Sequence, residues 1–129
     1  MNDDRGQTIV AVVLALGIAA TAIVGLRTAQ ERIVEATRAQ RAGEAAVEAA
    51  AQSVADAYAA HPGAAKELVR DPRVVEAARV AAEELARENG GHGVERVQLA
   101  CAGDRIEARL VLSGHSHHAG FKAPECSPP

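Results

Sequence analysis

The chain opens with one long apolar segment that carries no charge. Residues 8–26 read TIVAVVLALGIAATAIVGL, and about 20 such residues in a helix cross the hydrocarbon core of a bilayer. Arg5 and Arg27 flank the segment, as cations at the two membrane interfaces do. A buried core helix is the alternative, but the rest of the chain is too small to surround it. The pattern predicts a transmembrane helix over residues 7–27.

The helix is expected to continue far beyond this segment. No helix breaker occurs between Arg27 and Ala60, and the residues there are mostly strong helix formers. His61-Pro62-Gly63 then ends the helix. Its second half carries an apolar seam at 4-3-4 spacing, formed by Val47, Ala51, Val54 and Tyr58. The seam packs either inside the domain, as we expect for its C-terminal part, or against a neighbouring subunit.

A second helix is predicted from Asp71-Pro72 to Asn89-Gly90-Gly91. Asp71 is suited to the N-cap and Pro72 to the first helical position, where its missing N–H costs nothing. Asn89-Gly90 suits the left-handed conformation that follows a helix. The apolar stripe of this helix, expected to face the seam of the first, consists of Val74, Ala78, Ala81 and Leu85.

The pattern then changes to the two-residue period of a strand. Apolar residues alternate over 97–101 and again over 106–112, and Ala102-Gly103-Asp104 is a plausible turn between them. An isolated hairpin is marginal in water, so its apolar face must pack on the helices. Residues 114–129, rich in Gly, His, Ser and Pro, are predicted to form an irregular, flexible tail. The predicted class is α+β: the long transmembrane-plus-amphipathic helix, a second helix and a small antiparallel β-hairpin, with residues 28–113 as the domain.

Composition limits what this domain can do. Of the 129 residues 48% are hydrophobic, but there is no Trp, one Tyr and one Phe. Small side chains bury little area each, so a deep core with an enclosed pocket is not expected. The net charge of −3 mixes both signs along the chain and gives no nucleic-acid footprint. Only Tyr58 and Phe121 would offer stacking platforms, so no nucleic-acid partner is predicted.

The two cysteines, Cys101 and Cys126, are what an exported protein pairs in a disulfide. The alternative is two unrelated thiols, with Cys101 a small residue of its strand. Three histidines, His115, His117 and His118, precede Glu125 and Cys126, and these are suitable ligand types for zinc or copper. Their H-x-H-H spacing has no rigid element to fix its geometry. We therefore predict no metal site and no cofactor, and keep a single-pass metal-binding protein as an alternative.

No catalytic motif accompanies these residues. Cys101 and a histidine could form a nucleophile–base pair, but the chain has no phosphate-binding glycine loop, G-x-S-x-G or H-E-x-x-H. The small core would also do little to exclude water. The sequence predicts a protein that is not an enzyme.

The N-terminus permits three kinds of processing. Arg5-Gly6-Gln7, directly before the apolar helix, resembles a type IV prepilin leader, which is cut after its Gly. The resemblance would make Gly6 and Gln7 the processing junction and residues 1–6 a leader. The fifth residue after that junction is Ala11, where most pilins carry Glu. Ala20-Thr21-Ala22 fits a secretory cleavage site instead, and an uncleaved anchor is the third possibility.

The order of elements resembles the TadE/TadG-like proteins of the tight-adherence (Flp-type) pilus-assembly systems, to about Ser113. The features are the Arg-Gly-Gln leader, the apolar helix, alanine-rich helices such as the one around 38–51, and a Val-rich strand ending in Cys101. The resemblance implies a pseudopilin or minor-pilin-like component, single-pass in the cytoplasmic membrane with its C-terminal domain outside. It implies no catalytic residues. The implied partners are the lipid bilayer, other pilus or secretion-system subunits, and prepilin peptidase.

The distribution of arginines favours the opposite orientation. Arg5 is the sole basic residue before the apolar segment, whereas Arg27, Arg32, Arg38 and Arg41 follow it. The side richer in Lys and Arg stays in the cytoplasm. A cytosol-facing membrane scaffold is therefore a further alternative.

Overall fold

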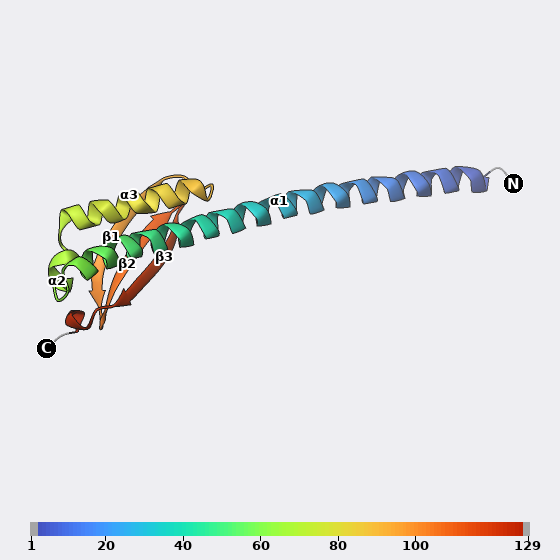
Figure 1. The fold of residues 1–129 in the computed structure, drawn as a ribbon. Helices are drawn as coiled ribbons and strands as arrows, with labels where there is room; N and C mark the ends of the chain where they lie inside the picture. Colours follow the sequence, from blue (N-terminus) through green and yellow to red (C-terminus); the bar gives the residue numbers. More distant parts are fainter. Residues whose placement is uncertain (1–2, 128–129) are drawn as a thin grey trace. The chain divides into compact units, whose positions relative to one another are not determined.

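The computed structural model describes residues 3–127, with the side chains of Gln7 and of residues 9–127. The elements in chain order are α1 (Asp3–Ala60), α2 (Ala65–Leu68), α3 (Pro72–Glu88), β1 (Val94–Ala102), β2 (Arg105–Leu112), β3 (His115–Lys122) and the 3-10 turn η1 (Pro124–Cys126) (Figure 1). The predicted α+β class, with a long N-terminal helix and a second helix, is confirmed. The chain divides into two structural units, Met1–Ala36 and Thr37–Pro129, which we describe separately.

Helix boundaries follow the local signals in the sequence. Helix α1 ends just before His61-Pro62, because a residue preceding proline is disfavoured in the helical region, and Gly63 turns the chain with φ +88°. At the start of α3 the Asp71 carboxylate accepts a hydrogen bond of 2.8 Å from the backbone N–H of Arg73. At its end, Gly90 takes a positive φ of +77°. The predicted end of the first helix and both predicted limits of α3 are confirmed, whereas α1 begins earlier than expected, at Asp3.

The three strands form one antiparallel sheet in the order β1-β2-β3. Two-residue turns connect them: Gly103 begins the first with φ +60°, and Ser113 and Gly114 form the second with φ +50° and +76°. Positive φ values at these positions give turns whose twist matches that of the flanking strands. The predicted hairpin of β1 and β2 is confirmed.

The prediction of an irregular tail from residue 114 was wrong. Residues His115–Lys122 form β3, which pairs with β2 in an unbroken register, and η1 follows it. The sheet accepts this polar strand because every second residue faces the helices. His117, Ala119 and Phe121 lie opposite Leu110, Ala108 and Ile106. These three residues extend the inner face of the sheet beyond the two strands of the predicted hairpin.

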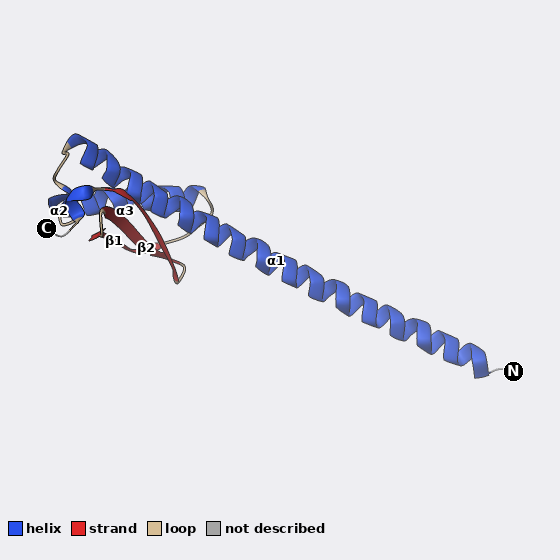
Figure 2. Cartoon of the chain, turned by 90° about the horizontal axis from the view of Figure 1, so that it is seen from below, coloured by secondary structure: helices blue, strands red, loops and turns tan. Residues whose placement is uncertain are grey.

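The second half of α1 and helix α3 cover this inner face of the sheet (Figures 1 and 2). The sheet contributes four fully buried residues of β2, namely Ile106, Ala108, Leu110 and Leu112. Each helix contributes a row of buried alanines at four-residue spacing: Ala42, Ala46 and Ala50 from α1, and Ala78, Ala82 and Ala86 from α3. Rows of this kind let helix backbones approach closely, because each side chain is a single methyl group.

The apolar seam of α1 packs inside the domain, as expected for its C-terminal part, with Val47 and Val54 buried. The stripe predicted for α3 is confirmed at Val74 and Ala78, and it is wrong by one position in the second half of the helix. Ala82 and Ala86 are buried, whereas Ala81 and Leu85 are half-buried. The smaller methyl groups occupy the face of closest contact, and the larger leucine lies at its margin.

One glycine of α1 lies directly against β3. A Cβ atom on Gly43 would lie 2.1 Å from Nε2 of His117, whose ring is almost completely buried at 7% exposure. No real side chain fits at that distance unless the ring moves. The absence of a side chain at position 43 therefore lets the imidazole pack against the helix.

We predict that Gly43→Ala destabilises the domain by about 1–3 kcal/mol, the usual cost of overpacking a core, although alanine is the better helix former. The measurement is chemical unfolding of the detergent-solubilised protein. His117→Ala should make room for the new methyl group, so the double variant should lose less than the sum of the two single variants. Simple additivity of the two changes would contradict the contact.

Candidate functional site: the anchor helix and the disulfide-closed end of the domain

The first candidate functional feature is the exposed apolar part of α1. Within the described residues, α1 is the helix that is long and apolar enough to cross a membrane, judged by length and composition. Its large side chains are uncovered, with Ile9 and Leu16 each 65% exposed and Leu26 64% exposed. Such a surface is unfavourable in water and suited to lipid.

The hydroxyls of Thr21 and Thr28 are satisfied within the helix itself. Thr21 Oγ1 donates to the carbonyl of Ile18 at 2.9 Å, and Thr28 Oγ1 donates to the carbonyl of Val24 at 3.0 Å. Hydroxyls paired in this way avoid the cost of an unsatisfied donor in hydrocarbon. The segment therefore presents no unpaired hydroxyl from these threonines to a bilayer.

The predicted processing junction lies at the beginning of the same helix. Gly6 and Gln7 belong to α1, and the side chain of Gln7 is exposed. Cleavage after Gly6 stays a prediction.

Cys101 and Cys126 form a disulfide, with their Cα atoms 5.1 Å apart and a sequence separation of 25 residues. Cys101 lies near the end of β1, and Cys126 ends η1 and is buried. In the chain-entropy model a cross-link over this separation stabilises the fold by about 3 kcal/mol. The bond is typical of proteins that fold outside the cytoplasm.

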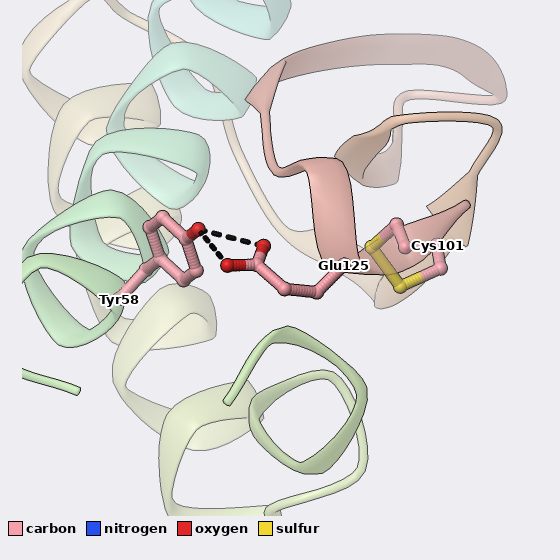
Figure 3. The surroundings of a disulfide bond; sticks show 4 residues. Tyr58, Cys101 and Glu125 are labelled. Carbon is pink, nitrogen blue, oxygen red and sulfur yellow. Dashed lines mark hydrogen bonds between the residues drawn. A yellow bond between two sulfur atoms is a disulfide. The ribbon is translucent and has the colours of Figure 1, made fainter. Parts of the chain in front are cut away.

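Beside the disulfide, helix α1 is joined to η1 by a hydrogen bond (Figure 3). Tyr58 Oη donates to the Glu125 carboxylate, at 2.9 Å from Oε1 and 2.7 Å from Oε2. The Tyr58 ring also packs on Phe121 of β3, with ring centroids 5.7 Å apart. The end of α1, the end of β3 and the turn η1 are thus held together in one place.

This hydrogen bond shifts the acidity of both partners. The Tyr58 hydroxyl holds the pKa of Glu125 below its ordinary value, helped by a backbone hydrogen bond. The Glu125 carboxylate in turn raises the pKa of Tyr58, through the hydrogen bond first and through burial and charge after it. The pair favours an ionised Glu125 and a protonated Tyr58.

The structure separates the three histidines considered as metal ligands. His117 points to α1 over Gly43, and His118, its neighbour on the strand, points to the opposite face of the sheet. His115 Nδ1 lies 3.0 Å from the carbonyl oxygen of Ser113. Cys126 is in the disulfide and Glu125 accepts from Tyr58. Within the described residues no group of three or more His, Cys, Asp or Glu side chains could hold a metal ion.

The nucleophile considered in the sequence is also engaged elsewhere. Cys101 is in the disulfide, and the described residues contain no free cysteine. Sequence reasoning missed the Tyr58–Glu125 hydrogen bond, since its partners are 67 positions apart and no local pattern joins them. The signal that existed was composition, because Tyr58 is the single tyrosine in a chain almost without aromatic residues.

Comparison with known proteins adds no relative: no family model, no curated protein and no solved structure matches this chain.

We predict that Tyr58→Phe lowers stability near neutral pH and that its difference from the wild type disappears at acidic pH. Because the folded-state pKa of Glu125 is lowered, its contribution is present above the ordinary value of 4.5 and is lost as the pH falls through the folded-state pKa. The measurement is urea unfolding of both proteins from about pH 7 to about pH 3. The ring contact with Phe121 is kept in the variant, so a difference independent of pH would contradict this role for Glu125.

Proposed function

We propose that this chain is a membrane-anchored, pilin-like structural component of a tight-adherence (Flp-type) pilus or a related secretion assembly. One observation carries the proposal. An exposed apolar helix begins near the N-terminus, and the same helix α1 supplies the core of a small, disulfide-bonded α/β domain. This combination is consistent with a type IV pilin-like architecture. The resemblance to TadE/TadG-like proteins supports the narrower assignment.

The proposed roles divide along α1. Its apolar part anchors the protein in the cytoplasmic membrane as a single pass. Its second half, with α3 and the sheet, forms a stable domain that presents contact surfaces to other subunits. We assign no catalytic chemistry to the protein, because the side chains most suited to it are used in the disulfide and in packing.

The domain is proposed to lie outside the cytoplasm. The disulfide favours this side, because thiols in the cytoplasm are kept reduced. The arginines that follow the apolar segment favour the cytosol-facing alternative. Delivery by dedicated prepilin machinery would account for the export of a domain with this charge distribution.

Processing of the N-terminus tests the pilin-like assignment. Protein purified from its native membrane should begin at Gln7, as shown by intact mass and N-terminal sequencing, because a prepilin peptidase cuts after the leader glycine. Gly6→Leu should keep the start at Met1. Gly17→Leu, the same substitution within the helix where no neighbour lies within 4 Å, should be processed normally. A wild-type start at Met1 or at Ile23 would contradict the pilin-like assignment.

Labelling of the cysteines tests on which side of the membrane the domain lies. In intact cells, a membrane-impermeant maleimide should label Cys101 and Cys126 only after treatment with an impermeant reductant, because the pair is oxidised and outside. The matched control is the Cys101→Ser/Cys126→Ser variant, which should remain unlabelled. Labelling of the wild type only after lysis would establish the cytosol-facing alternative.

A further inference from the structure

The two edges of the sheet differ in how well they are protected. At the β1 edge the register shifts between Val94 and Arg96, and such bulges discourage pairing with another strand. Side chains of α2 and of the residues after it also lie near this edge. They line a groove together with the end of β1, and they are Lys66, Val69 and Arg70. Over its eight residues β3 contains no proline, no carboxylate and no register shift. Near its end the backbone carbonyl of Gly120 accepts a hydrogen bond of 2.5 Å from Arg105 Nη2, so the open part of the edge is its first half.

The turn before β3 determines which of its backbone groups face the free edge. Leu112 and His115 flank a two-residue turn, so they form the hydrogen-bonded pair that closes it. Hydrogen-bonded pairs alternate with non-hydrogen-bonded pairs in an antiparallel ladder. His117 and Ala119 therefore bond to β2, whereas Ser116 and His118 direct their N–H and C=O groups away from it. The bond of 2.7 Å from Ala123 N to Asp104 O continues the same alternation.

The side chains beside this edge favour a partner with negative charge. Ser116 and His118 line a shallow depression of about 380 Å³ on the outer face of the sheet. Its lining has two arginines, Arg96 and Arg109, against one carboxylate, Glu107. Glu107 is already paired with Arg109 at 2.8 Å. At the end of β3, Lys122 adds a further cation, with Asp104 3.8 Å from it.

On the inner face the same edge is mainly apolar. His117 is buried, and Ala119 and Phe121 are half-buried against the core. A strand added along β3 would place alternate side chains on these two faces. Acidic residues would lie beside the depression, and apolar residues would lie beside Ala119 and Phe121.

We propose that the free edge of β3 binds an extended segment of a partner protein, which adds to the sheet as a fourth strand and carries alternating acidic and apolar residues. Backbone hydrogen bonds would supply affinity and the alternating side chains would supply specificity. A second copy of β3 does not fit this description, because its sequence HSHHAGFK contains a cation and no carboxylate. This inference rests on the proposed function, and it specifies the kind of protein segment that one of the contacts with other subunits would involve.

The test uses the full chain in detergent micelles and a capped nine-residue peptide of alternating Glu and Val. The matched control peptide has Lys in place of each Glu. The acidic peptide should bind and should slow amide hydrogen exchange at Ser116 and His118 by about tenfold or more. Exchange at His117 and Ala119, which already bond to β2, should be unchanged. Equal affinity for the two peptides, or binding without slower exchange at Ser116 and His118, would overturn the proposal.

A pair of variants examines the backbone contribution directly. His118→Pro removes an N–H that faces the free edge, a position where a strand tolerates proline, and should weaken binding of the acidic peptide. His118→Ala loses the same imidazole but keeps the N–H, so the proline variant should bind about tenfold more weakly than this matched control. If the amides of Ser116 and His118 are already protected without peptide, in proportion to protein concentration, the occupant is a second copy and the proposal is wrong. A start at Met1 would remove the pilin-like assignment without affecting this peptide experiment.

Discussion

The close approach of α1 to the sheet and to α3 is the contact on which the rest of the domain depends. It is made with very small residues: alanines at four-residue spacing on both helices, and Gly43 under the ring of His117. The large side chains that are fully buried come mainly from β2, namely Ile106, Leu110 and Leu112, whereas the small side chains of the helices contribute little buried area each. Its stability therefore requires backbones that fit together closely.

Two further connections compensate for this thin core. The disulfide between Cys101 and Cys126 fixes the last turn to β1, and Tyr58 joins the end of α1 to the same turn through Glu125. Both act at one end of the sheet, where Ala123 and Cys126 are buried. The chain thus places its single tyrosine and both cysteines where the core alone would hold the C-terminus weakly.

Much of the fold could be predicted because its signals are local. Asp71-Pro72 and Asn89-Gly90 delimit α3 through capping chemistry, and alternating apolar residues identify β1 and β2. Strand β3 was missed because His115–Lys122 carries three histidines spread over both faces and contains a glycine. Its weak signals were the Ser113-Gly114 turn and the two-residue spacing of His117, Ala119 and Phe121. These residues become apolar partners only when α1 covers them, which is a tertiary effect that no local pattern contains.

The candidate site was predictable to a similar degree. The two cysteines could be recognised in the sequence as a candidate pair. They meet only because the turn η1, which carries Cys126, lies beside the end of β1, which carries Cys101. The histidines looked like one cluster in the sequence, and the pleat of β3 separates them onto opposite faces. The Tyr58–Glu125 contact depends on where η1 lies, and this follows only from the complete sheet.

The placement of core residues along the chain also determines when the domain can fold during synthesis. Gly43 packs against His117, which comes 74 residues later, and Cys101 pairs with Cys126, which comes 25 residues later. No early segment can complete this core by itself. The apolar part of α1 is therefore synthesised, and available to a membrane-insertion machinery, while the domain is still unfolded.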